Sequence, residues 1–175
     1  MVAFLKSIEE IEGTFQSPIL LQVILMILKD KIEKLAAEFL ENTDKFVMNL
    51  KVTSGNLIIV TIDGDTLVTI DDCIKMSRFI EHSLDREEED FELRVMSYGA
   101  DKPLINPRQY NKHIGRELDI TKTDDTSIKG TLVEITDNDI LISKSKTKKK
   151  KDDAETEIRV LFDQIKEVKI ILSFK

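Results

Sequence analysis

The chain reads LIIVTIDGDTLVTIDDCI over residues 57–74, and this stretch decides the fold of the N-terminal half. Leu57–Ile62 is apolar on both faces at all but one position, which is typical of a strand inside a sheet. Asp63-Gly64-Asp65 is expected to end that strand in a turn. Thr69 is followed three residues later by Asp72, which resembles a capping box and predicts a helix. The stretch therefore predicts a central strand, a turn and a helix.

Periodicity on either side of this stretch predicts an α+β unit. Apolar residues recur every three or four positions in a helix from about Met26 to Leu40. They alternate with polar residues in strands at Phe46–Val52 and Phe91–Val95. The helix after Thr69 is expected to bury one face, made of Ile70, Cys73, Ile74, Ser77, Ile80 and Leu84. The order helix, strand, strand, helix, strand predicts a three-stranded sheet with both helices on one face.

The C-terminal half is expected to be a separate small β domain. Glycine and proline interrupt the periodicity at residues 97–103, which marks a domain boundary. We assign residues 26–98 to the αββαβ domain and residues 99–175, including the linker, to the second domain. Five short strands without a long helix predict a small barrel; they are expected near Glu117–Lys122, Ile128–Glu134, Asp139–Lys144, Glu157–Leu161 and Lys166–Phe174. Few contacts should cross such a linker, so the two domains are expected to reorient.

Residues 1–25 are predicted to be an N-terminal extension outside the fold. Ile19–Leu28 is apolar at every position but Gln22, whereas the helix from Met26 onward has a single apolar stripe. Met26 is therefore expected to be the natural first residue. The competing interpretation is an added helix that packs on the sheet or on a second copy. A segment of ten residues is too short to span a membrane, so no membrane association and a cytoplasmic location are expected.

Charge is distributed unevenly along the chain, whose net charge is −7. Residues 1–100 contain 10 Lys or Arg and 19 Asp or Glu, whereas residues 101–175 contain 16 and 14. An acidic half suits docking on a basic protein, and a mildly basic half suits contact with phosphate. Two ordinary solvated surfaces are the alternative interpretation.

The residues that could carry chemistry do not indicate an enzyme, a metal site or a cofactor. Four aspartates between Asp63 and Asp72 form the densest carboxylate cluster, but the spacing does not complete an EF-hand loop. We expect turn and cap roles there, with a carboxylate-metal hydrolase as the alternative. Cys73 is expected to be a buried small residue, and His82 and His113 have no ligand-like neighbours. The sequence also contains no Gly-rich phosphate loop and no nucleophile elbow.

One basic segment stands out as a candidate nucleic-acid contact. Its lysines lie between two predicted strands: Lys144, Lys146, Lys148, Lys149, Lys150 and Lys151. Such a run is usually a solvated loop, but in a protein bound to RNA it would contact phosphates. No two glycines have the spacing of a GXXG loop, and there is no tryptophan for an aromatic platform. A general RNA-binding module that uses this segment is therefore the alternative function.

Three stretches resemble the ribosome maturation factor RimP family. LIIVTID at 57–63, followed by VTIDDC at 68–73 and Ser77-Arg78, resembles the family's strand, turn and T-L-D-D-C…S-R helix start. FELRV at 91–95 resembles the approach to the family's linker. SYGADKPL at 97–104 lies where the family has S-P-G-L-D-R-P-L, and HIGRE follows at 113–117. The similarity covers about residues 26–175. Tyr98, Ala100 and Lys102 depart from the family's proline, leucine and arginine.

The resemblance implies an αββαβ domain followed by an SH3-like, Sm-like barrel. It implies a non-catalytic assembly factor for the small (30S) ribosomal subunit, and no small-molecule substrate. The implied partners are a ribosomal protein of the decoding face and 16S rRNA, and a monomer is expected. The expected linker contacts with partners are Ser97, Gly99, Asp101, Lys102, Pro103, Leu104 and Arg116, and the expected rRNA contacts are the lysines between Lys144 and Lys151.

Overall fold

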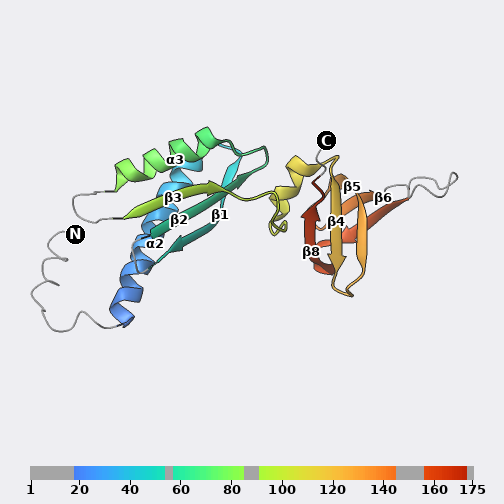
Figure 1. Cartoon of the computed structure of the whole chain (residues 1–175), viewed down its shortest axis with the longest axis horizontal. Helices are drawn as coiled ribbons and strands as arrows, with labels where there is room; N and C mark the ends of the chain where they lie inside the picture. The colour runs from blue at the N-terminus through green and yellow to red at the C-terminus, as the bar shows by residue number, and fades with distance from the viewer. Residues whose placement is uncertain (1–17, 54–56, 85–90, 145–155, 173–175) are drawn as a thin grey trace, which may run out of the picture. The chain divides into compact units, whose positions relative to one another are not determined.

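The computed structural model describes residues 18–53, 57–84, 91–144 and 156–172 (Figure 1). The fold is α+β, as predicted. The N-terminal elements are α2 (Pro18–Leu40), β1 (Lys45–Val52), β2 (Leu57–Gly64), α3 (Ile70–Ser83) and β3 (Glu92–Ser97). The C-terminal elements are the 3-10 helix η1 (Pro107–His113), β4 (Glu117–Lys122), β5 (Ser127–Ile135), β6 (Asp139–Lys144), β7 (Glu157–Leu161), the 3-10 helix η2 (Phe162–Gln164) and β8 (Ile165–Ile170).

The N-terminal strands form a three-stranded sheet in the order β1-β2-β3, so β2 is central as predicted. Alternate residues of β2, Ile58, Val60 and Ile62, are fully buried. Helices α2 and α3 contact each other, and the rings of Phe39 and Phe79 lie 5.4 Å apart between centroids. Burial of each of the three aliphatic side chains of β2 contributes roughly 1.5–3 kcal/mol to stability.

Helix α2 begins at Pro18, earlier than the predicted start near Met26. Proline is well accommodated in the first turn of a helix, since its missing N–H would be unpaired there anyway. The predicted stripe is confirmed further along, because Ile32 and Ala36 are buried. The earlier residues Ile19, Val23, Met26 and Ile27 are exposed, however. None of the helices in the described ranges is long and apolar enough to cross a membrane.

The buried face of α3 differs from the predicted one. Ile80 and Leu84 are buried as predicted, but Ile70 is 81% exposed and Ile74 is 43% exposed, and the fully buried Met76 was not predicted. The buried stripe is rotated toward Met76, which leaves the two isoleucines on its flank. Cys73 is half-buried rather than buried, and burial is the main cause that raises the pKa of its thiol.

The C-terminal strands pair antiparallel in the order β7-β6-β5-β4-β8. Three of the five strands, β4, β6 and β7, have the predicted bounds. In the described ranges β7 and β8 are the two edges of this sheet and do not pair with each other. The core of the sheet is aliphatic except for Tyr110; it contains Leu104, Tyr110, Leu118, Ile120, Leu132, Ile140, Ile142, Val160, Val168 and Ile170.

Strand β5 has two irregularities where it pairs with β6. A Cβ at Gly130 would lie 2.5 Å from both the Ile142 Cγ2 and the Ser143 carbonyl oxygen, so only glycine allows the two strands to approach so closely. Leu132 pairs with Ile142 and Glu134 pairs with Leu141, which leaves Val133 as a bulged residue.

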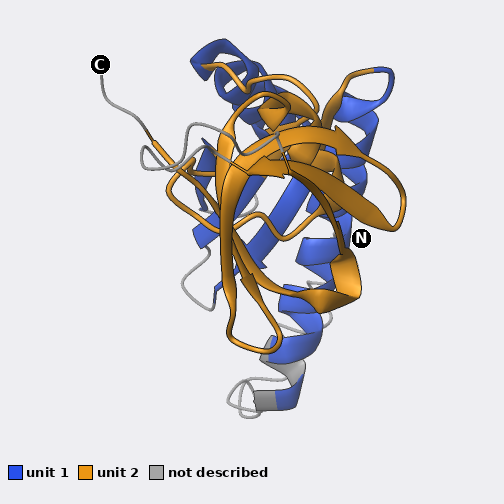
Figure 2. Ribbon diagram, turned by 90° about the vertical axis from the view of Figure 1, so that its right-hand side faces the viewer, with its two compact units in different colours: residues 1–42, 47–61, 70–96 blue, residues 43–46, 62–69, 97–175 orange. Residues whose placement is uncertain are grey.

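The chain forms two compact units (Figure 2). The first contains residues up to 42, residues 47–61 and residues 70–96. The second contains residues 43–46, 62–69 and 97–175. The start of β1 and the end of β2 therefore belong to the same unit as the linker, η1 and the five-stranded sheet. The site described next lies entirely within this second unit.

Candidate functional site

The site begins at the end of β2, where the sequence predicted a turn. That prediction is wrong for Asp63 and Gly64, because β2 continues through both residues. Asp63 is 2% exposed, and its Oδ1 accepts a hydrogen bond of 2.9 Å from the Gly64 N–H. A Cβ at Gly64 would lie 2.5 Å from Lys45 Cδ and 2.8 Å from the Thr66 carbonyl oxygen. The strand can continue because the carboxylate is satisfied by partners and the glycine leaves room.

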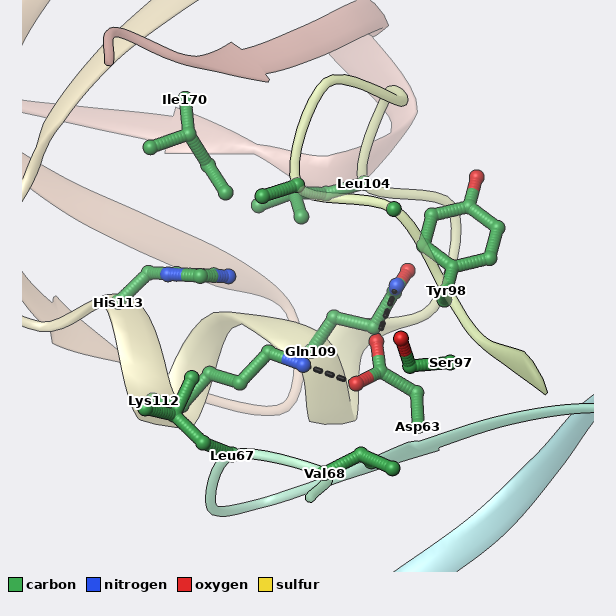
Figure 3. A pocket seen from close by; sticks show the side chains of 12 residues that line it. Asp63, Leu67, Val68, Ser97, Tyr98, Leu104, Gln109, Lys112, His113 and Ile170 are labelled. Atoms are coloured by element: carbon green, nitrogen blue, oxygen red, sulfur yellow. Dashed lines mark hydrogen bonds and ion pairs between the residues drawn. The ribbon is translucent and has the colours of Figure 1, made fainter. Parts of the chain in front are cut away.

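Two side chains of η1 satisfy the buried Asp63 carboxylate (Figure 3). Gln109 Nε2 donates to Oδ2 at 2.7 Å, and Lys112 Nζ donates to Oδ1. Gln109 Oε1 in turn accepts from the backbone N–H groups of Ile105 and Asn106, at 2.8 and 2.9 Å. Gln109 is fully buried, and the Asp63 and Lys112 side chains are 3% and 10% exposed. A buried charge pair of this kind is tolerated only when its remaining hydrogen bonds are made, as they are for Asp63.

The sequence reasoning missed η1 and its role. Asn106 caps this helix, and Gln109 completes a capping box with it, with Pro107 in the first turn. The pattern Asn-Pro-Arg-Gln is a sequence signal for such a box, so the helix start was detectable. The contacts of Gln109 and Lys112 with Asp63 could not be detected in the sequence. Asp63 lies 46 residues before Gln109 and 49 before Lys112, and pairing over such distances leaves no local pattern.

A more exposed ion pair lies beside the buried one. Arg108 Nη2 lies 2.7 Å from Asp65 Oδ2, and its guanidinium lies 4.3 Å from the centroid of the Phe46 ring. The hydrogen bond from Arg108 is the main cause that lowers the pKa of Asp65. A guanidinium that pairs with a carboxylate and also covers an aromatic face holds both groups in a fixed orientation.

A third polar group fixes the start of β1. The Thr66 N–H donates to Asp44 Oδ2 at 2.9 Å, and the Thr66 hydroxyl donates to the same oxygen. The hydroxyl bond from Thr66, followed by the bond from Lys45, lowers the pKa of Asp44 to about 2. Asp44, Asp63 and Asp65 thus each have cationic or hydroxyl partners, so the second unit holds these strand ends through charge.

A cavity of about 220 Å³ lies next to the buried pair. Its polar lining includes Asp63, Ser97, Lys112 and His113, and Tyr98 lies on its wall (Figure 3). The apolar lining consists of Leu67, Val68, Leu104 and Ile170. The imidazole of His113 points from η1 into the cavity, and its Nδ1 is buried and has no hydrogen-bond partner among the described residues.

Burial is the main cause that lowers the pKa of His113 to about 4. The charges of Lys112 and Arg116 lower the pKa further, and the charge of Asp63 opposes them with a smaller effect. The ring is therefore neutral at pH 7 and lies in a positive local potential.

The predicted linker residues are only partly brought together. Ser97, Gly99 and Leu104 line the cavity, with Leu104 buried and its N–H donating to the Val168 carbonyl at 2.8 Å. Gly99 and Lys102 close a turn through a 3.1 Å backbone hydrogen bond. The remaining predicted residues, Asp101, Lys102, Pro103 and Arg116, are outside the cavity lining.

Tyr98 stands where the family that the sequence resembles has proline, and it makes hydrogen bonds that proline could not make. Its N–H donates to the Ile62 carbonyl oxygen at 2.9 Å, a bond that proline cannot make. Its hydroxyl donates to the Pro103 carbonyl oxygen at 2.8 Å, and Lys102 Nζ lies 5.3 Å from the ring centroid. Tyr98 thus fastens both ends of the linker turn.

The other predicted residues lie apart from this cluster. Lys144 is exposed at the end of β6, and Lys146 and Lys148–Lys151 lie outside the described residues. In the aspartate cluster, Asp71 pairs with Lys75 at 2.6 Å on α3, while Asp63 and Asp65 pair with η1. Three of the four carboxylates proposed for a metal site therefore have side-chain cations as partners, which disfavours the hydrolase alternative. His82 lies on α3 with its Nδ1 2.5 Å from the Arg78 carbonyl oxygen.

Comparison with known proteins decides the family. Residues 35–101 match the model of the RimP N-terminal domain. Over 118 residues the chain is 48% identical to the ribosome maturation factor RimP of Christiangramia forsetii, covering 67% of this chain and 76% of the relative. The chain belongs to the RimP family. This confirms the resemblance, and no enzyme family is indicated.

Two other RimP proteins extend the comparison. The one from Flavobacterium psychrophilum is 43% identical over 127 residues, covering 72% of this chain and 82% of its own. The one from Cytophaga hutchinsonii is 25% identical over 150 residues, covering 77% and 90%. The RimP N-terminal match ends at residue 101. It thus includes Asp63 and Asp65 but not their partners on η1.

Proposed function

We propose that this chain is a non-catalytic assembly factor for maturation of the small (30S) ribosomal subunit. It binds the immature subunit through a decoding-face ribosomal protein and 16S rRNA. The observation that carries the proposal is membership of the RimP family, whose relatives are named ribosome maturation factors. Under this proposal the five-stranded sheet is the core of an SH3-like barrel, and the chain acts as a cytoplasmic monomer.

The site supports a binding role. Asp44, Asp63 and Asp65 are each held by hydrogen bonds or ion pairs that connect segments of the second unit, which is a structural role. The resulting arrangement presents a fixed surface rather than a reactive group. A fixed surface can bind one conformation of a partly assembled particle and so raise the population of that conformation.

Charge supports a division of labour along the chain. The first 100 residues, with 19 acidic and 10 basic side chains, suit a basic protein, and the lysines from Lys144 to Lys151 suit RNA phosphates. The same lysines are the observation that favours the second candidate, a general RNA-binding module. That module would bind any RNA, without preference for a subunit.

Co-sedimentation tests the proposal directly. Purified full-length chain is mixed with immature 30S, mature 30S or 50S particles and run through sucrose gradients at two salt concentrations. We expect the chain to move with immature 30S particles and to be absent from the 50S fraction. Equal binding to both subunits, or to naked RNA alone, would replace the assembly factor with the general RNA module.

A further inference from the structure

The cavity next to His113 has the features of a built binding site. His113 is 7% exposed, its ring extends into the cavity, and its Nδ1 has no hydrogen-bond partner among the described residues. Asp63 and Lys112 on the polar wall form an ion pair with each other. Leu104 and Ile170 give an apolar wall, with the Tyr98 ring beside them (Figure 3). Polar groups converging on an apolar hollow are typical of small-ligand sites.

The tautomer of His113 defines what the cavity can bind. An orphaned buried N–H is costlier than an orphaned lone pair, so we assign His113 the neutral tautomer in which Nδ1 is unprotonated. The proton of the neutral ring is then on Nε2, and the ring extends into the cavity. Lys112 and Arg116 place His113 in a positive potential that outweighs Asp63. The site therefore offers a hydrogen-bond donor and favours a ligand that brings an acceptor.

The size and the walls narrow the ligand further. A volume of about 220 Å³ is below the ~300–1,000 Å³ of pockets for drug-sized ligands. It suits one ring rather than a whole nucleotide. Aliphatic walls and an aromatic side chain favour a flat, weakly polar ring, as in the capture of unstacked bases from single-stranded RNA. A phosphate group would have to leave water for these apolar walls, which is costly for a charged group.

We propose that the cavity binds a single unpaired nucleobase that presents a carbonyl oxygen, such as uracil, to His113 Nε2–H. The inference rests on the proposed function insofar as it takes the ligand from RNA. The base would lie against Tyr98, Leu104 and Ile170. Ser97 at the rim provides a hydroxyl that can donate or accept.

The chain contains an internal control for this proposal, because His113 and His82 are its two histidines. Full-length protein labelled with ¹⁵N in its histidines is titrated with uridine and followed by ¹H–¹⁵N NMR of the rings. We expect the His113 ring signals to move and those of His82, on α3, to stay. Adenosine, which has no carbonyl on its base, should produce a smaller shift at the same concentration.

Two further probes separate a base from other occupants. Inorganic phosphate stands for an RNA backbone or a free anion, and acetamide stands for a protein amide. A His113 shift with either probe that equals the shift with uridine would overturn the proposal. So would an unmoved His113 at the highest uridine concentration, or equal shifts with adenosine.

A matched pair of variants tests the donor. His113→Phe keeps a ring but removes Nε2–H, and His82→Phe makes the same change on α3. Loss of one such hydrogen bond should weaken uridine binding about 3- to 10-fold, read from the backbone amide signals of Ser97 and Gly99. His82→Phe should leave binding unchanged, and equal affinity in both variants would overturn the role of His113. If His113→Phe does not fold, the titration of the wild-type protein with uridine still shows whether the base binds next to His113. Nucleoside binding is measured on the isolated chain, so its failure is distinct from failure to bind particles.

Discussion

Lys112 donates a hydrogen bond from its ammonium to Oδ1 of Asp63, which is 49 residues earlier in the chain, and both side chains are almost completely buried. This pair joins the end of a strand from the N-terminal sheet to the 3-10 helix that precedes the five-stranded sheet. Both residues belong to the second compact unit. The integrity of that unit therefore depends on a contact that spans the linker in sequence.

Replacing Lys112 should be much more costly than replacing an exposed lysine. In Lys112→Met the Asp63 carboxylate stays buried without its cation, which typically costs about 3–5 kcal/mol. Lys129→Met is the matched control, because Lys129 pairs with Asp119 at the surface, where such pairs contribute about 0–1 kcal/mol. Urea denaturation of both variants measures the difference. Similar small losses in both would show that the buried pair does not hold the unit together.

The free energy of unfolding should decrease as the pH decreases from about 6.5 to 4, because His113 takes up its proton at a lower pH in the folded chain than in the unfolded chain. Its pKa is lowered to about 4 from the ordinary value of 6.5, so the unfolded chain takes up a proton first as the pH decreases. The stabilisation is complete above about pH 6.5 and is lost toward pH 4, by at most about 3 kcal/mol. The nearby charges, Lys112, Arg116 and Asp63, act on this same ring.

Chemical denaturation between pH 4 and 7 measures this effect. His113→Phe should flatten the pH dependence in that window, and His82→Phe should retain it. Asp44, with a pKa of about 2, affects stability only at lower pH. A variant without His113 that keeps the full pH dependence would assign the effect to other groups.

The sequence predicted the order of elements but not the contacts that build the site. Periodicity located β2 and placed it centrally, because a short run that is apolar on both faces is typical of a strand covered on both sides. The same reasoning misread Asp63-Gly64, since turn chemistry is a local rule and Asp63 is satisfied by distant partners on η1. It also chose Ile70 and Ile74 over Met76, because residue type does not fix how a helix is rotated about its axis. His113 was dismissed because no neighbour in sequence suggested a role.

The lysine segment should contribute to particle binding and not to folding. The composition of this segment predicts a solvated loop, so changing Lys148–Lys151 to Ser should leave the melting temperature unchanged, since solvated charges contribute little to stability. If these lysines bind phosphates, the slope of log affinity against log salt should decrease by about 0.7–0.9 for each phosphate that is no longer neutralised. The measurement is a salt series of binding to immature 30S particles, and an unchanged slope would make the segment a solvated loop.

Removing residues 1–25 should not destabilise the protein. Ile19 and Val23 on the first turns of α2 are exposed, so their removal loses little burial, although Ile24 and Leu25 are half-buried. We expect the chain of residues 26–175 to be soluble, to melt no lower than the full chain and to bind particles equally well. Thermal denaturation compares the melting temperatures of the two proteins. Aggregation, or a loss approaching the ~5–15 kcal/mol stability of a domain, would show that the segment is structural.

The bulge at Val133 determines which insertions and deletions this strand can accept. Before the bulge the inward positions of β5 are even-numbered, as at Gly130 and Leu132, and after it the apolar residue packed against the core is Ile135. Deleting Val133 would restore strict alternation and leave Glu134 outward and Ile135 inward, because these two residues already follow Leu132 in the pairing with β6. If the strand instead straightened with Val133 retained, Ile135 would turn toward solvent and the charged Glu134 toward the core. Point substitutions at this exposed valine and its deletion are expected to be tolerated, whereas one further residue inserted at the same position is not. Added length should therefore be under stronger selection here than residue identity.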